Sequence, residues 1–180
     1  MKNSIYLIAI IFLVIAGCQK KPKQYPNVTF VQVFQDLKWD YNYAKVKNIF
    51  ETKYGLEFSN ELDPSKNSKN ARHLKTFVFD GGKISGLKSQ SWTITFDKDT
   101  LIYVLVGISS ETPYKCAKEI LALRDTINNL PYEKFPRINY EWILHEKGKA
   151  IGRIQMINGF GKGITISFSS NKFINKYSYM

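Results

Sequence analysis

The sequence has 180 residues and lacks an apolar run long enough to cross a bilayer as a helix. A helix that spans the hydrocarbon core needs about 20 consecutive apolar residues. The longest run here, Ile5–Ala16, has 12. No long low-complexity segment and no second linker interrupt the rest of the chain. These absences argue against a helical membrane span and indicate one domain after the N-terminal segment.

The sequence is also poor in residues that carry chemistry. It has two histidines, His73 and His145, which are far apart and lie in no spaced ligand motif. The nucleophile motif G-x-S-x-G is absent. Three carboxylates, Glu57, Glu61 and Asp63, cluster in sequence, but their spacing matches no calcium loop and favours a solvated loop face. We therefore expect no metal, no other cofactor and no catalytic set.

The N-terminus has the three parts of a secretory signal, which are a charged start, a short apolar core and small residues at its end. The core is followed by Ile15-Ala16-Gly17-Cys18, which matches all four positions of the lipobox, so this N-terminus resembles that of bacterial lipoproteins. The resemblance implies that residues 1–17 are removed and that the Cys18 thiol carries a diacylglycerol. It also favours the outer membrane in a Gram-negative cell, because Gln19 stands where Asp usually signals inner-membrane retention.

The segment 18–26 is predicted to be a basic, extended tether, and 27–180 a single domain. The lysines of this tether would lie near anionic lipid head groups. The formal net charge is +11 and becomes +10 when Lys2 leaves with the signal. A basic balance favours an anionic membrane or an acidic partner, and export argues against nucleic acid. The 22 lysines against 4 arginines, with 20 isoleucines and 13 asparagines, fit an AT-rich genome equally well.

Periodicity and turn residues predict an α+β domain, an antiparallel sheet with helices packed on it. The order of elements suggests two α-β-β-β units. Residues 28–34 permit a strand, and a helix through 30–38 is equally plausible. A loop is predicted over 59–72, and the tail from Asn171 is expected to be loosely held. Helices are predicted over 44–54 and Pro113–Asn128, and strands over Leu74–Asp80, Ser91–Phe96, Leu101–Ile108, Tyr140–His145, Ala150–Ile157 and Ile164–Ser169.

Two loops are the candidate interaction surfaces. One is the most basic stretch of the domain, and the other is glycine-rich with an aromatic residue at its tip. A strand is predicted after the glycine-rich loop, which argues against phosphate binding because a phosphate loop leads into a helix. The residues chosen are Lys66, Lys69, Arg72 and Lys75 in the first loop, and Phe160 and Lys162 in the second.

Three functions stay open from the sequence. The first is a non-enzymatic envelope lipoprotein that binds a protein or an envelope polymer, with inhibitors and immunity proteins as a specific case. The second is an anchored enzyme acting on an envelope substrate. The third is a carrier of a lipid or small ligand, for which an apolar cavity of several hundred Å³ is expected. Cys116 falls on the apolar side of a predicted helix, where a buried thiol is favoured over a reactive one.

Overall fold

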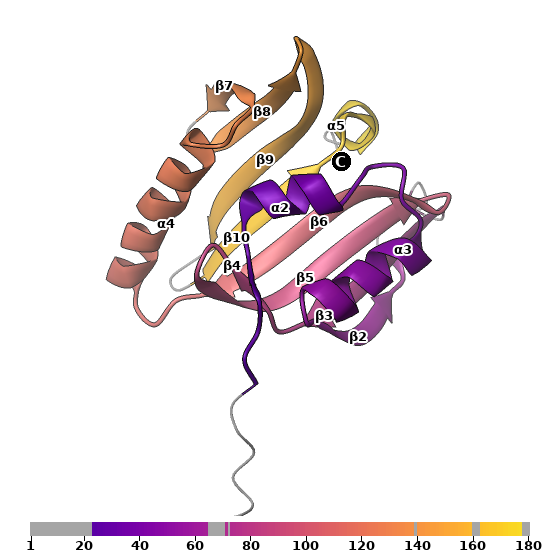
Figure 1. Cartoon of the computed structure of the whole chain (residues 1–180), viewed down its shortest axis with the longest axis horizontal. Helices are drawn as coiled ribbons and strands as arrows, with labels where there is room; N and C mark the ends of the chain where they lie inside the picture. Colours follow the sequence, from indigo (N-terminus) through magenta and orange to yellow (C-terminus); the bar gives the residue numbers. More distant parts are fainter. Residues whose placement is uncertain (1–22, 65–70, 72, 139, 160–162, 178–180) are drawn as a thin grey trace, which may run out of the picture.

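The computed structural model describes residues 23–64, 71, 73–138, 140–159 and 163–177, which form an α+β domain, as predicted (Figure 1). The elements run β1 (Asn27–Val28), α2 (Phe30–Asp36), α3 (Tyr43–Asn48), the π-helix η1 (Ile49–Lys53), β2 (Glu57–Leu62), β3 (Leu74–Asp80), β4 (Lys83–Ile84), β5 (Leu87–Asp97), β6 (Thr100–Ser109), α4 (Pro113–Asn128), β7 (Glu133–Ile138), β8 (Glu141–Glu146), β9 (Lys149–Gly159), β10 (Gly163–Ser169) and α5 (Asn171–Tyr177).

The sheet consists of two antiparallel meanders joined at their last strands. The first runs β2-β3-β5-β6 and the second runs β7-β8-β9-β10, and β6 pairs with β10 between them. Each half therefore has four long strands after its helix, and the predicted α-β-β-β unit was one strand short. The two missed strands, β2 and β7, are the edge strands of the two meanders. All six residues of β2 are exposed, and β7 contains Pro136. Neither strand therefore has the alternating apolar pattern by which a half-buried strand is predicted from sequence.

The sheet is mixed, so the prediction of a purely antiparallel sheet was wrong. The short strand β1 runs parallel to β4, because the chain that enters the domain lies alongside the hairpin of β4 and β5 before it turns into α2. The end of the predicted tether also contacts the domain. A Cβ placed on Gly81 would lie 2.7 Å from the Tyr25 ring, and one on Gly55 would lie 3.1 Å from Pro26. Glycine at these two positions leaves room for the entering chain.

Three helices cover one face of the sheet. Phe34 of α2 packs edge-on against Phe168 of β10, with ring centroids 5.5 Å apart, and Phe50 of η1 packs against Trp92 of β5 at 5.6 Å. The helix predicted over 44–54 is thus present as α3 continued by η1. Of the strand over 28–34 and the helix through 30–38 that the sequence left open, the helix is present, as α2. The helix over Pro113–Asn128 is α4, whose Thr112 side chain accepts a hydrogen bond from the Lys115 amide at 3.2 Å.

The opposite face of the sheet carries α5. The Phe173 ring stacks on Tyr103 of β6 with centroids 4.4 Å apart, and Lys172 Nζ lies 2.9 Å from the buried carboxylate of Asp97. The expectation of a loosely held tail after Asn171 was therefore wrong for residues 171–177. A short amphipathic helix with one aromatic contact gives little periodic signal, so the sequence pattern did not predict it.

Candidate functional site

Most of the predicted site residues lie outside the described residues. These are Cys18, Lys66, Lys69, Arg72, Phe160 and Lys162. Lys75 is described and exposed on β3, opposite Phe96 of β5. The two loops therefore stay predictions as interaction surfaces.

The groups considered for acid–base, metal or thiol chemistry are dispersed. His73 lies 3.7 Å from Asp97, whereas the His145 ring packs against Phe135 at the other end of the sheet. No group of three potential metal ligands is found in the described parts of the chain. Cys116 is buried, and its thiol donates to the Gly163 carbonyl at 3.7 Å. Burial, followed by the negative charge of Glu119, raises the pKa of this thiol.

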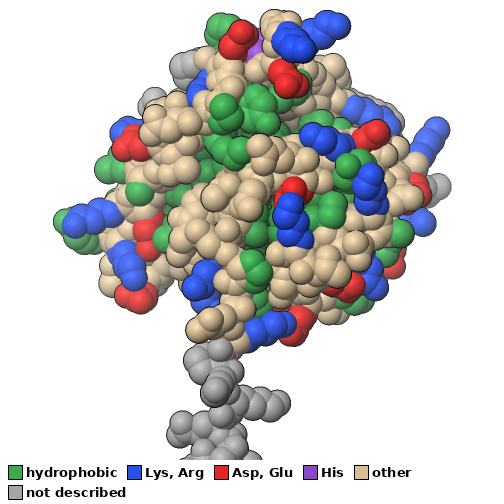
Figure 2. All heavy atoms as spheres, viewed as in Figure 1, with side chains coloured by type: hydrophobic (Ala, Val, Ile, Leu, Met, Phe, Trp, Pro, Cys, Tyr) green, Lys and Arg blue, Asp and Glu red, His purple; other side chains and the backbone are tan. Residues whose placement is uncertain are grey.

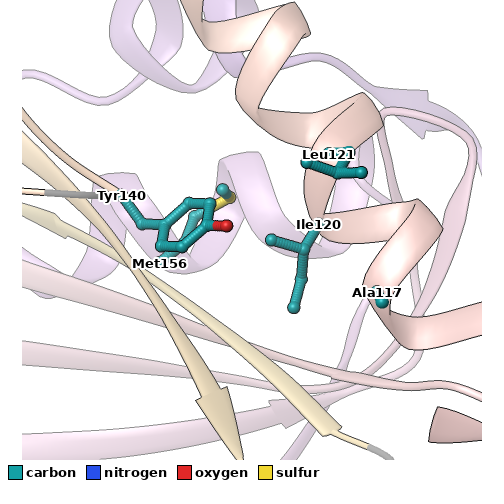
Figure 3. Close-up of a pocket in the computed structure, with 5 residues that line it drawn as sticks. All are labelled: Ala117, Ile120, Leu121, Tyr140 and Met156. Carbon is teal, nitrogen blue, oxygen red and sulfur yellow. The ribbon is translucent and has the colours of Figure 1, made fainter. Parts of the chain in front are cut away.

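An apolar pocket of about 240 Å³ lies between α4 on one side and strand β9 with the connection from β7 to β8 on the other (Figure 3). Hydrophobic side chains also gather over β8 and β9 in the space-filling view of this face (Figure 2). Leu121 is 44 % exposed and Tyr140 is 36 % exposed, so the pocket opens to solvent. Its described lining consists of Ala117, Ile120, Leu121, Tyr140 and Met156.

The helix side of the pocket follows from the spacing of apolar residues in α4. Cys116, Ile120, Leu123 and Ile127 form the buried stripe of this helix. Ala117 and Leu121 each follow a residue of this stripe, so they lie on its flank, and both are exposed. Because alanine has no side chain beyond Cβ, space is left between this flank of α4 and the sheet.

The sheet side of the pocket follows from strand register. Met156 of β9 pairs with Ile166 of β10, which pairs with Val106 of β6. Directly paired residues point to the same face, so Met156 points to the face that the helices cover. In Figure 3 the Tyr140 side chain lies beside Met156, and its hydroxyl end points toward α4.

Tyr140 has an unusual backbone conformation for its residue type. Its φ angle is +70°, and it lies in the tight connection between β7 and β8, where Ile138 pairs with Glu141. Two-residue hairpin connections require positive φ, and glycine is the residue favoured there. The Tyr140 carbonyl accepts a hydrogen bond from the Met156 amide at 2.8 Å, which ties the connection to β9.

Sequence reasoning missed this pocket because it placed Tyr140 inside a strand. The strand β8 begins at Glu141, so the predicted strand over Tyr140–His145 began one residue early. Trp142 and Leu144 are buried, as the predicted alternation requires, whereas Tyr140 belongs to the turn. Asn139 is a turn-forming residue just before it, and it was the available signal.

A buried ion pair lies on the opposite face of the sheet. Arg153 Nη1 donates to Glu141 Oε1 at 3.1 Å, and both side chains are nearly buried. Nearby, burial raises the pKa of the Tyr103 hydroxyl, an effect opposed by its hydrogen bond with Ser167. Glu141 pairs with Gln155 in the β8–β9 register, so the pair ties adjacent strands together and is best explained as structural.

No protein-family model and no curated protein matches this chain. Among the described residues, no helix has the length and apolar character that a membrane span requires.

Proposed function

We propose that this chain is an exported lipoprotein, anchored through Cys18, whose α+β domain is a non-enzymatic binding module of the cell envelope. The signal-like N-terminus and the lipobox support the anchor. The partner is a protein or an envelope polymer, and nucleic acid is disfavoured by export. In a Gram-negative cell, Gln19 favours the outer membrane.

The apolar pocket is the observation that carries the binding role. Its described lining contains no carboxylate, no histidine and no thiol. These are the groups that an envelope hydrolase would bring together around its substrate. Concave apolar surfaces that open to solvent are typical of recognition sites. The volume, about 240 Å³, is below the roughly 300–1,000 Å³ of pockets that enclose a whole small ligand. Recognition of part of a larger partner is thus favoured over carriage of a lipid.

Site-specific photocrosslinking in living cells tests the binding role. A photoreactive amino acid replaces Leu121 at the pocket, and a matched control carries it at Ala122, which is exposed on the same helix outside the pocket lining. We expect one recurring adduct from position 121, reduced when an unlabelled wild-type copy is co-expressed. Equal adducts at both positions, or none at 121, would contradict a binding role for this pocket.

A further inference from the structure

We propose that the end of the domain on which the tether lies faces the membrane, and that its lysines bind the head groups of anionic phospholipids. This inference rests on the proposed lipid anchor at Cys18 and adds the orientation of the domain and the class of lipid that it contacts. Lys23 is the fifth residue after Cys18, so a fully extended chain separates the two by at most about 18 Å. The side of the domain that holds Lys23 is therefore the side nearest to the bilayer.

The described end of the tether is fixed on the domain by several contacts. Lys23 forms an ion pair with Glu57 at the start of β2, and the Tyr25 ring lies where a Cβ on Gly81 would be. The next residues pair with β4 as the strand β1. Figure 1 shows that the chain then leaves the domain past β4, on the side opposite the β8–β9 hairpin. These contacts set which side of the domain is turned toward the anchor.

Two lysines face each other at this end of the domain. Lys83 of β4 and Lys88 of β5 are directly opposite in the hairpin and both are exposed. Like charges directly opposite each other in an antiparallel pair are destabilising. Among the described residues, no carboxylate forms an ion pair with either lysine. An anion from outside the chain would relieve this repulsion, and a lipid phosphate is the anion that the anchor brings within reach.

A polar hollow beside the lysine pair gives the head group a place to bind. Its volume is about 480 Å³, and its described lining consists of Gly81, Lys88, Ser89, Gln90 and Ser109. Gln90 and Ser109 are exposed, so the side-chain amide and hydroxyl can donate hydrogen bonds to phosphate oxygens. The volume lies within the roughly 300–1,000 Å³ of small-ligand sites, so a single head group has room.

The charge balance of this end also favours an anionic surface. Two nearby carboxylates are already paired, Glu57 with Lys23 and Glu111 with Lys115. Asp80 is exposed and lies opposite Glu57 across β2 and β3, where Lys23 supplies positive charge. The tether contributes two further lysines before Lys23. Basic side chains lie on both sides of the point where the chain leaves the domain (Figure 2).

Lipid photocrosslinking tests the orientation and the lipid preference together. The mature lipidated chain is placed in nanodiscs of phosphatidylcholine and phosphatidylglycerol, with an alkyne tag on one lipid at a time. A diazirine amino acid replaces Gln90 at the hollow, and a matched control carries it at Lys147, which is exposed in the β8–β9 hairpin. We expect lipid adducts from position 90, mostly with phosphatidylglycerol, and few from position 147. Equal yields at the two positions would overturn the orientation, and no preference for phosphatidylglycerol at position 90 would overturn the anionic ligand.

Variants of the lysine pair test its role in the preference. With the probe at position 90, Lys83→Gln combined with Lys88→Gln should lower the preference for phosphatidylglycerol by up to about thirtyfold, the combined effect of two lysines at an anionic surface. Both side chains are exposed, so the fold should be retained. Lys83→Arg with Lys88→Arg keeps the charge and should keep the preference.

The matched control is Lys147→Gln with Lys149→Gln, which removes the same charge from the β8–β9 hairpin and should leave the preference unchanged. A preference that survives in the Lys83→Gln, Lys88→Gln variant would overturn the role of the pair.

The mass of the purified chain separates failure of this inference from failure of the proposed anchor. A chain without lipid on Cys18 would refute the anchor and the membrane-facing surface together. A lipidated chain with equal adducts at positions 90 and 147 would refute the membrane-facing surface alone. The crosslink at Leu121 tests the binding role of the apolar pocket independently of either result.

Discussion

The amide of Met156 donates a hydrogen bond to the carbonyl oxygen of Tyr140 at 2.8 Å. This bond ties the connection between β7 and β8 to the neighbouring strand β9 while Tyr140 has a φ of +70°. The backbone geometry at Tyr140 is therefore set by the sheet and not by its own side chain. The relative stability of a glycine and an alanine variant at this position should therefore be the reverse of the usual order.

Tyr140→Gly should be more stable than Tyr140→Ala by about 1 kcal/mol, because glycine adopts positive φ without a steric penalty. At negative φ alanine is normally the more stable of the two. Urea unfolding of both variants measures the difference. An alanine variant equal to or more stable than the glycine variant would show that the connection is not strained.

The ion pair of Arg153 and Glu141 should be strongly coupled because both side chains are nearly buried. Arg153→Met alone leaves a buried carboxylate and should lower the free energy of unfolding by about 3–5 kcal/mol. The double variant Glu141→Leu with Arg153→Met should recover much of this loss. As a control, Lys115→Met breaks the exposed pair with Glu111 and should change stability by less than about 1 kcal/mol. Equal losses of unfolding free energy in Arg153→Met and Lys115→Met would contradict the strong coupling of the buried pair.

The contact of Tyr25 with Gly81 should hold the end of the tether on the domain. Gly81→Ala places a Cβ 2.7 Å from the Tyr25 ring at φ +88°, whereas Gly86→Ala meets nothing within 4 Å at φ +85°. Both variants carry the same backbone penalty, so their difference isolates the ring contact. We expect Gly81→Ala to speed limited proteolysis before residue 27, relative to Gly86→Ala. Equal cleavage rates would show that the contact does not hold this segment.

The Cys116 thiol should be protected in the folded protein. Burial and the nearby Glu119 raise its pKa, so the fraction of thiolate at pH 8 is lower than for an ordinary cysteine, whose pKa is about 8.5. A colorimetric thiol reagent at pH 8 should react slowly with the native chain and rapidly after unfolding in urea. Rapid reaction of Cys116 in the native chain would contradict its buried position.

The sequence predicted the elements whose residues alternate between a buried and an exposed face. Trp92, Ile94 and Phe96 are buried in β5, and the spacing of Cys116, Ile120 and Leu123 matches α4. The edge strands β2 and β7 were missed because an edge strand has one neighbour and need not bury a face. Periodicity reports burial, and these strands are formed by backbone pairing.

The pocket was harder to predict than the fold for a different reason. Its lining joins residues from α4, β9 and the turn at Tyr140, which are far apart in the chain. Each residue has an ordinary role in its own element, and the cavity arises because Ala117 is small where α4 crosses the sheet. The conformation of Tyr140 depends on the pairing of β7 with β8, and β7 had not been predicted.

Metabolic labelling with an alkyne fatty acid tests the proposed lipid anchor at Cys18, on which the proposed envelope location depends. Wild type, Cys18→Ser and the matched control Cys116→Ala are labelled in a bacterial host, and membranes are separated from the soluble fraction. We expect label on the wild type and on Cys116→Ala, both in membranes, and none on Cys18→Ser. Label retained by Cys18→Ser, or an unlabelled wild type outside the membrane fraction, would contradict anchoring through Cys18.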